Sequence, residues 1–163
     1  MDIIVRKAVS DDIDGITEIY NDSVLNSIAT FDTESKDIDE QRRWFEYHDQ
    51  RHPILVAEEN GKVSGWICLS EWCDRQAYSD TAELSIYVHQ DMRGRGIGRK
   101  LIEAVIHEAR SIKLHVIIAR IETSNKIIIH LLKIFGFKQI GVMKEVGFKF
   151  GKLLDVLIMQ LVL

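Results

Sequence analysis

A short run of glycines and arginines is the segment of this sequence with the clearest chemical meaning. Residues 93–98 read RGRGIG and lie between a strand-like segment and a helix-like one. Closely spaced glycines let a backbone turn tightly and approach a ligand without clashes from Cβ atoms. A helix that begins here adds unpaired N–H groups and a partial positive charge. The segment is therefore typical of a cradle for an anion such as a pyrophosphate.

The spacing around these glycines excludes two common phosphate-binding motifs. No Gly-Lys-Ser/Thr follows, so the segment is not a Walker A loop, and Leu101 occupies the third glycine position of the dinucleotide-binding G-x-G-x-x-G pattern. What remains is R-x-x-G-x-G after a strand that ends in Tyr-Val. Arg99 and Lys100 add positive charge for phosphates. On the glycines alone, an ordinary turn with solvated arginines remains an equal alternative.

A carboxylate lies in the strand before this loop. In residues 81–89, apolar side chains alternate with polar ones, which is the pattern of a strand with one buried face. Glu83, Ser85 and Tyr87 share the polar face. The sequence thus predicts a carboxylate and an anion cradle at the two ends of one strand.

The remaining segments indicate the elements that must hold these residues. Ser10, Asp11 and Asp12 offer N-cap oxygens for a helix start. Asn60-Gly61 between two strand-like segments is a strong hairpin signal. We predict a single α/β domain over residues 1–163, with a mixed, mostly antiparallel sheet flanked by helices in the order βααβββαβαββ. The predicted strands are residues 3–9, 53–59, 63–72, 81–89, 115–121 and two within 136–163; helices follow residue 12, run through residue 44, follow residue 96 and span 125–135.

Composition limits the classes of function. The net charge of −4 argues against a general nucleic-acid or membrane-surface binder. Two cysteines, Cys68 and Cys73, do not complete a zinc set or a disulfide framework, and free thiols suit a reducing cytoplasm. We find no signal peptide and no apolar run long enough to span a membrane. The expectation is a soluble cytoplasmic protein without a metal.

The order of several motifs resembles the GNAT N-acetyltransferases, whose coenzyme A loop reads Q/R-x-x-G-x-G/A. The resemblance covers nearly the whole chain. It is strongest to the phosphinothricin and methionine sulfoximine acetyltransferases, also described as L-amino acid N-acyltransferases. The matching pieces are the segment 30–32, Arg75 and Tyr78, the strand 81–88, the loop 93–98, Asn125, Gly136-Phe137, and the segment 146–151 with Asp155.

The resemblance implies the GNAT fold, acetyl-coenzyme A as co-substrate and a set of binding residues. Backbone groups of residues 86–88 would pair with the pantetheine arm, the loop would hold the pyrophosphate, and Asn125 would contact the coenzyme near its thiol end. The implied coenzyme-binding residues are Ile86, Tyr87, Val88, Arg93, Gly94, Arg95, Gly96, Ile97, Gly98, Arg99 and Asn125. The implied acceptor-binding residues are Phe31, Arg75, Tyr78, Glu83 and Ser85.

Acetyl transfer requires a neutral amine, and an α-amino group has a pKa of about 7.7 to 8. Glu83 is the candidate general base, acting directly or through a water; the alternative is a solvated strand carboxylate. Arg75 is the candidate partner of an acceptor carboxylate, because a guanidinium binds a carboxylate bidentately. A loop salt bridge between Arg75 and Asp74 or Asp80 is the alternative.

The sequence departs from the family pattern after Asn125. Leu132 occupies a position where relatives carry Tyr or His, and Ile128 replaces the usual Ser. His130 lies about 200° around the helix from Leu132 and is expected to be a surface or structural residue. The group that protonates the leaving thiolate is therefore open, with Tyr87 or solvent as candidates.

We predict transfer of an acetyl group to the amine of a small amino-acid-like substrate, by direct attack on the thioester. A protein N-terminal or lysine acetyltransferase, and a non-catalytic coenzyme A-binding protein, are the alternatives. The resemblance also implies a homodimer.

Overall fold

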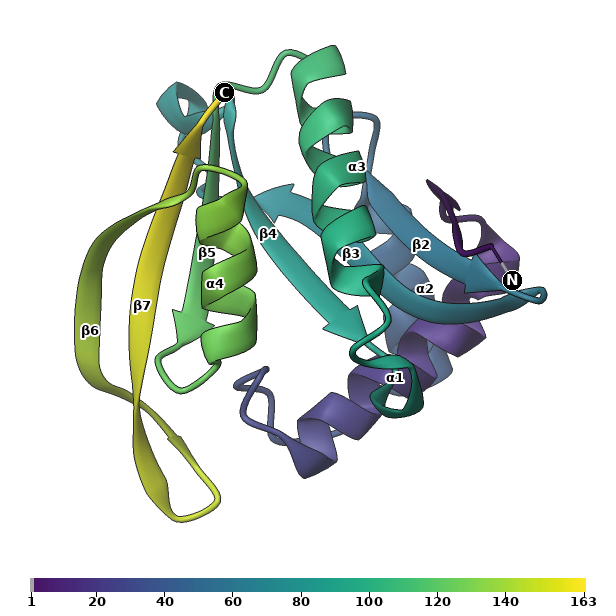
Figure 1. Cartoon of the computed structure of the whole chain (residues 1–163), viewed down its shortest axis with the longest axis horizontal. Coiled ribbons are helices and arrows are strands. Elements are labelled where there is room, and N and C mark those ends of the chain that lie inside the picture. Colours follow the sequence, from purple (N-terminus) through teal and green to yellow (C-terminus); the bar gives the residue numbers. More distant parts are fainter. Residues whose placement is uncertain (1) are drawn as a thin grey trace.

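A seven-stranded mixed sheet forms the centre of the protein (Figure 1). The computed structural model describes residues 2–163. The strand order is β1-β2-β3-β4-β5-β7-β6; within these residues β4 and β5 form the only parallel pair, and every other pair is antiparallel. The strands are β1 Ile4–Lys7, β2 Ile54–Glu59, β3 Lys62–Glu71, β4 Thr81–Val88, β5 Val116–Glu122, β6 Lys138–Lys149 and β7 Lys152–Val162. The helices are α1 Ile13–Asn26, α2 Ile38–Tyr47, α3 Ile97–Ser111 and α4 Lys126–Ile134, with short 3₁₀ turns at Ser10–Asp12, Gln76–Tyr78 and Gln90–Met92.

The predicted fold class and element order agree with the structure, and the predicted boundaries differ by a few residues at most. Asn60 and Gly61 both have positive φ angles, of 54° and 76°, as a two-residue turn between antiparallel strands requires. The predicted N-cap of α1 is wrong in detail. The carboxylate of Asp12 bonds to Arg6 and to the backbone N–H of Val9 rather than capping the helix, which ties β1 to the start of α1.

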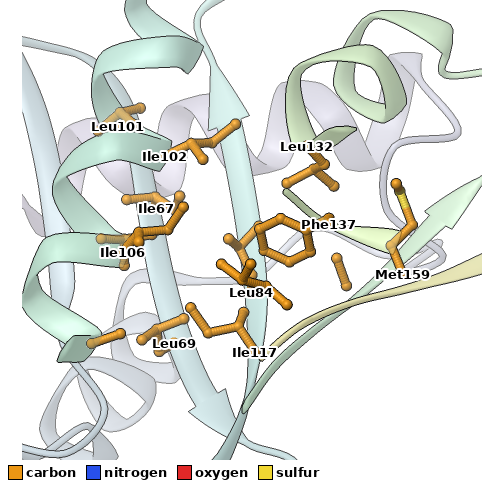
Figure 2. Close-up of a cluster of buried hydrophobic side chains, with 14 of the residues drawn as sticks. Ile67, Leu69, Leu84, Leu101, Ile102, Ile106, Ile117, Leu132, Phe137 and Met159 are labelled. Atoms are coloured by element: carbon orange, nitrogen blue, oxygen red, sulfur yellow. The ribbon is translucent and has the colours of Figure 1, made fainter. Parts of the chain in front are cut away.

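The larger part of the core lies between the sheet and the helices α3 and α4, which cover the same face (Figure 1). Leu101, Ile102 and Ile106 recur at helical spacing and face Ile67 and Leu84 of the sheet (Figure 2). Leu132 and Phe137, at the end of α4 and just beyond it, join the same cluster. Because α3 is fixed by this packing, the loop before it is fixed as well.

A second, aromatic core lies on the opposite face, under α1 and α2. Trp66 of β3 packs against Tyr20, Trp44 and Tyr87, with ring centroids 6.1, 5.3 and 4.9 Å away. The alternation predicted for β4 is confirmed, since Ala82 and Leu84 belong to the first core whereas Tyr87 packs against this second one.

The strands β4 and β5 pair only at one end. Residues 81–83 pair with residues 116–118, and the two strands then diverge (Figure 1). Residues 84–88 of β4 pair with β3 on one side and have no strand partner on the β5 side. The divergence leaves backbone N–H and C=O groups along this edge of β4 unpaired by the sheet.

The strands β6 and β7 form a long hairpin at the edge of the sheet, and its turn extends beyond the helices (Figure 1). Phe148 and Leu153 lie directly opposite each other in this hairpin and are 68% and 58% exposed. Other exposed apolar residues of the hairpin are Ile140, Val142, Val146, Phe150 and Val162.

Candidate active site

The glycine loop has the backbone that its sequence predicts. Gly94 and Gly96 have φ angles of +76° and +79°, a left-handed conformation that glycine adopts without strain. Gly96 is the N-cap of α3, so the first N–H groups of this helix open toward the loop. A Cβ atom at either glycine would meet no heavy atom within 4 Å, so the space beside the backbone is open. This arrangement fits a pyrophosphate at the helix N-terminus.

The charged residues of the loop are not equally available to a ligand. Arg95 forms a bidentate ion pair with Glu59 of β2, with N–O distances of 2.9 and 2.6 Å. Arg93 and Arg99 are exposed. Ile97 is buried in the core, and Gly98 packs near Leu131 and Ile86, so these two residues can offer only their backbone to a ligand.

The unpaired edge of β4 leads to this loop. It includes Ile86, Tyr87 and Val88, the residues predicted to pair with the pantetheine arm. A ligand chain with amide groups could add to this edge like a further strand. The open edge and the glycine cradle together fit acetyl-coenzyme A, with its amides along β4 and its phosphates at the start of α3.

Glu83 has a partner that the sequence did not reveal. Arg120 of β5 binds both carboxylate oxygens of Glu83, with 2.7 Å between Nη2 and Oε1 and a second, shorter bond from Nε to Oε2. The guanidinium also lies over the ring of Trp72, 5.6 Å from its centroid. The hydrogen bonds that Arg120 donates to the Glu83 carboxylate raise the pKa of Arg120. Glu83 is therefore half of a fixed ion pair rather than a freely solvated carboxylate.

A cavity of about 210 Å³ lies on the face of the sheet that carries the aromatic core; Glu83 does not line it, but its cross-strand neighbour Ser70 does. Ser70 and Cys68 of β3 stand opposite Glu83 and Ser85 of β4, so these four side chains share that face. The cavity is lined by Tyr20, Asp32, Lys36, Gln41, Trp44, Trp66, Cys68, Ser70, Ser85 and Tyr87. The structure thus brings the predicted residue Ser85 to a pocket with polar and aromatic walls.

Burial changes the acidity of several groups in this pocket. It raises the pKa of the Cys68 thiol to about 12, so the thiol is a poor nucleophile at neutral pH. It also raises the pKa of Tyr87 above its usual range. The hydroxyl of Tyr20 donates a hydrogen bond to Asp32. Burial is the larger cause of the raised pKa of Tyr20, and this hydrogen bond is the second cause.

Three predicted acceptor-binding residues lie on loops. Arg75 and Tyr78 are exposed, and within residues 2–163 the guanidinium of Arg75 forms no hydrogen bond or ion pair. The alternative of a salt bridge from Arg75 to Asp80 is contradicted, because Asp80 pairs with Arg51. Phe31 packs so closely on the backbone of Gly147 in β6 that no side chain would fit there.

The segment around α4 gives mixed results. The side-chain oxygen of Asn125 accepts a hydrogen bond from the backbone N–H of Ile128 at 3.4 Å and caps α4, which leaves its amide nitrogen for a ligand. Leu132 is fully buried in the core, and His130 is exposed, which agrees with a surface position for this histidine. Within residues 2–163 no cluster of side chains has the composition of a metal site, and no helix has the length and hydropathy needed to cross a membrane.

Residues 16–137 match the Acetyltransferase (GNAT) family. The chain belongs to this family. GNAT acetyltransferases use acetyl-coenzyme A, and the glycine loop and open β4 edge described above suit that co-substrate. The protein is therefore an acetyl-coenzyme A-dependent N-acetyltransferase, and the predicted resemblance is confirmed.

Three similar proteins cover almost the whole GNAT chain. The L-amino acid N-acyltransferase MnaT of Escherichia coli K12 is 41% identical over 158 residues, which are 96% of this chain and 92% of the relative. A phosphinothricin acetyltransferase from Sinorhizobium meliloti, solved in complex with AcCoA, has a TM-score of 0.96 at 35% identity, covering 100% and 89% of the two chains. A structure described as ribosomal-protein-alanine N-acetyltransferase from Brucella melitensis has a TM-score of 0.95 at 38% identity, covering 98% and 99%.

The sequence contained one unused signal for this GNAT site. Arg120 interrupts the apolar run of residues 116–121, and a charged residue on an interior strand needs a partner or a ligand. Gln41 gave no such signal, because it lies in the charged helix α2 and only the structure shows it nearly fully buried on the pocket side.

Proposed function

We propose that this GNAT enzyme acetylates the α-amine of a small amino acid of the phosphinothricin or methionine sulfoximine type. The observation that carries the proposal is the cavity on the face of β4 from which Glu83, Ser85 and Tyr87 project. Its volume of about 210 Å³ is below the range of roughly 300 to 1,000 Å³ that is usual for drug-sized ligands, so it suits a small acceptor. The similar L-amino acid and phosphinothricin acetyltransferases support the same class of acceptor.

The chemistry asked of the protein is modest. Acetyl-coenzyme A supplies an activated acyl group, and the acceptor must present a neutral amine to it. An α-ammonium loses its proton at a pKa of about 7.7 to 8, so a nearby carboxylate or a water held by it is sufficient as the proton acceptor. Asp32 lines the cavity but is bonded to the Tyr20 hydroxyl, whereas Glu83 lies opposite the lining residue Ser70 in the sheet, and we assign the role to Glu83.

A second candidate function is acetylation of a protein N-terminus. The similarity to a structure described as ribosomal-protein-alanine N-acetyltransferase favours it. A peptide acceptor would have to extend out of the cavity into solvent, because the cavity itself suits only a small group. The two functions differ in whether the acceptor ends in a free α-carboxylate.

A steady-state assay of coenzyme A thiol release tests the proposal. The acceptor panel contains phosphinothricin, L-methionine sulfoximine, L-methionine, glycine, a peptide with an N-terminal alanine and a peptide with an internal lysine. We expect the first two acceptors to give the highest kcat/KM, with the background measured in the absence of acceptor. Higher kcat/KM for the N-terminal alanine peptide would favour the second function instead.

We also propose that the enzyme is a homodimer, as the resemblance to its group implies. The apolar hairpin of β6 and β7 supports a second copy of the chain as its partner. Its exposed pair, Phe148 and Leu153, would otherwise place large apolar surfaces in water.

A further inference from the structure

The ion pair between Arg120 and Glu83 can still bind a ligand that carries one negative and one positive group. The Arg120 side chain is 52% exposed, although two of its N–H groups are bound to Glu83, whose side chain is 18% exposed. Within the described residues, Nη1 of Arg120 forms no hydrogen bond. A guanidinium has more N–H donors, and a carboxylate more acceptor sites, than this single pair uses.

The pair is also held in place before any ligand arrives. Glu83 and Arg120 come from β4 and β5, close to the point where those strands stop pairing. The ring of Trp72 lies against the guanidinium and restricts its motion. A preorganised guanidinium loses little conformational entropy when it binds a carboxylate, so it binds more tightly than a mobile one.

We propose that this pair recognises the zwitterionic head group of the acceptor, with the α-carboxylate on Arg120 and the α-ammonium on Glu83. The inference rests on the proposed function and deepens it, because it restricts the acceptor to free α-amino acids. The two charged groups of an α-amino acid are separated by one carbon, which matches two adjacent opposite charges. The amino acid's side chain then extends toward Ser70 and Ser85 into the cavity.

This assignment replaces Arg75 as the partner of the acceptor carboxylate. Arg75 is exposed on a loop, and nothing within residues 2–163 holds its guanidinium. Arg120 is positioned by a bidentate ion pair and an aromatic ring, and its partner Glu83 belongs to the strand that borders the cavity. A mobile surface arginine supplies less binding energy than a fixed one, because its side-chain entropy is lost on binding.

The experiment compares L-methionine with L-methioninamide, whose amine and side chain are the same but which lacks the carboxylate. We expect the wild type to prefer the acid in kcat/KM by roughly 10- to 100-fold, as the loss of a charge-assisted hydrogen-bonded pair implies. Arg120→Gln should abolish this preference, mainly by raising KM for the acid. The KM for acetyl-coenzyme A should not change, and Arg120→Lys should retain part of the preference because it keeps the charge but not the fork.

Two further variants make the comparison specific. Arg110→Gln removes an exposed arginine at the end of α3 and should leave the acid preference as in the wild type. Arg75→Gln tests the competing site. Persistence of the preference in Arg120→Gln, or its loss in Arg75→Gln, would overturn the proposal.

Equilibrium binding separates this inference from the proposed function. Calorimetry measures the affinity of the acid and of the amide for the enzyme in the presence of coenzyme A. If the wild type binds the acid more tightly through Arg120 but releases no thiol with any amino acid, the inference holds and the proposed function fails. If thiol is released equally with acid and amide, the proposed function holds and the inference fails.

Discussion

At the scale of single residues, the proposed base Glu83 is already paired with an arginine before any substrate binds. The Glu83 side chain is mostly buried and bound on both oxygens by Arg120. Two bonds from a fixed guanidinium set the direction in which the carboxylate points. Proton removal from an α-ammonium is an undemanding step near neutral pH, so a well-positioned carboxylate is enough.

Replacement of Glu83 by glutamine tests this role. We expect Glu83→Gln to lower kcat/KM for the acceptor by roughly 10²-fold near neutral pH, because the proton acceptor is lost while the side-chain shape is kept. The loss should shrink as the pH rises above about 8, since the acceptor amine is then already neutral. Rates measured from pH 6 to pH 10 check this, and a loss of equal size at every pH would assign Glu83 to positioning only.

The limits of prediction from sequence are clearest at this scale. Glu83 and Ser85 could be placed on one face because strand alternation is a local rule. The partnership of Glu83 with Arg120 could not be predicted, because it depends on how β4 pairs with β5 across 37 residues of sequence. The stacking of Arg120 on Trp72 has the same origin, since neither residue type nor spacing indicates which strands are neighbours.

At the scale of elements, the coenzyme loop depends on backbone conformation rather than on side chains. Gly96 ends the loop and caps α3 with a φ angle of +79°. A side chain here would meet no protein atom, so the fold itself does not require the small size of glycine at this position. The left-handed backbone and the approach of a phosphate are what require it.

The variant Gly96→Val should therefore weaken acetyl-coenzyme A binding by roughly 100-fold or more while the protein still folds. Gly61→Val is the matched control, because Gly61 also has a positive φ angle and open space around it but lies in the β2–β3 turn. Both variants should lose about 1–2 kcal/mol of unfolding free energy through left-handed strain. Calorimetry and thermal unfolding measure the two effects, and equal coenzyme affinity in the two variants would contradict a binding role for the loop.

The elements themselves were largely predictable because each carries a local signal. The hydrophobic spacing of α3 and the Asn60-Gly61 turn agree with the structure. The start of α1 was less predictable, because Asp12 is used by Arg6 from another element instead of by its own helix. A capping residue can be recognised from sequence only when no other partner competes for it.

At the scale of the whole molecule, the two halves of the sheet carry different features. The β1–β4 half, with α1 and α2 on one face and α3 on the other, carries the cavity and the coenzyme loop. The β5, β7 and β6 half ends in a hairpin whose apolar residues are partly exposed. The same hairpin is joined to the loop near the cavity by Lys149, whose Nζ donates to the backbone oxygen of Thr30 at 2.8 Å. If two copies associate through the hairpin, the interface therefore contacts, through Lys149, the loop that supplies Asp32 to the acceptor pocket.

The dimer can be tested by placing a charge on the hairpin. The wild type should sediment as a dimer at micromolar concentration, and Phe148→Glu should sediment as a monomer, because a buried unpaired carboxylate is costly at an apolar interface. Phe148 is 68% exposed in the single chain, so the variant should keep its fold. Tyr47→Glu is the control, since Tyr47 is 77% exposed on α2 and should remain dimeric when changed. A monomeric wild type would disprove the dimer, whereas a dimeric Phe148→Glu variant would move the interface away from this hairpin.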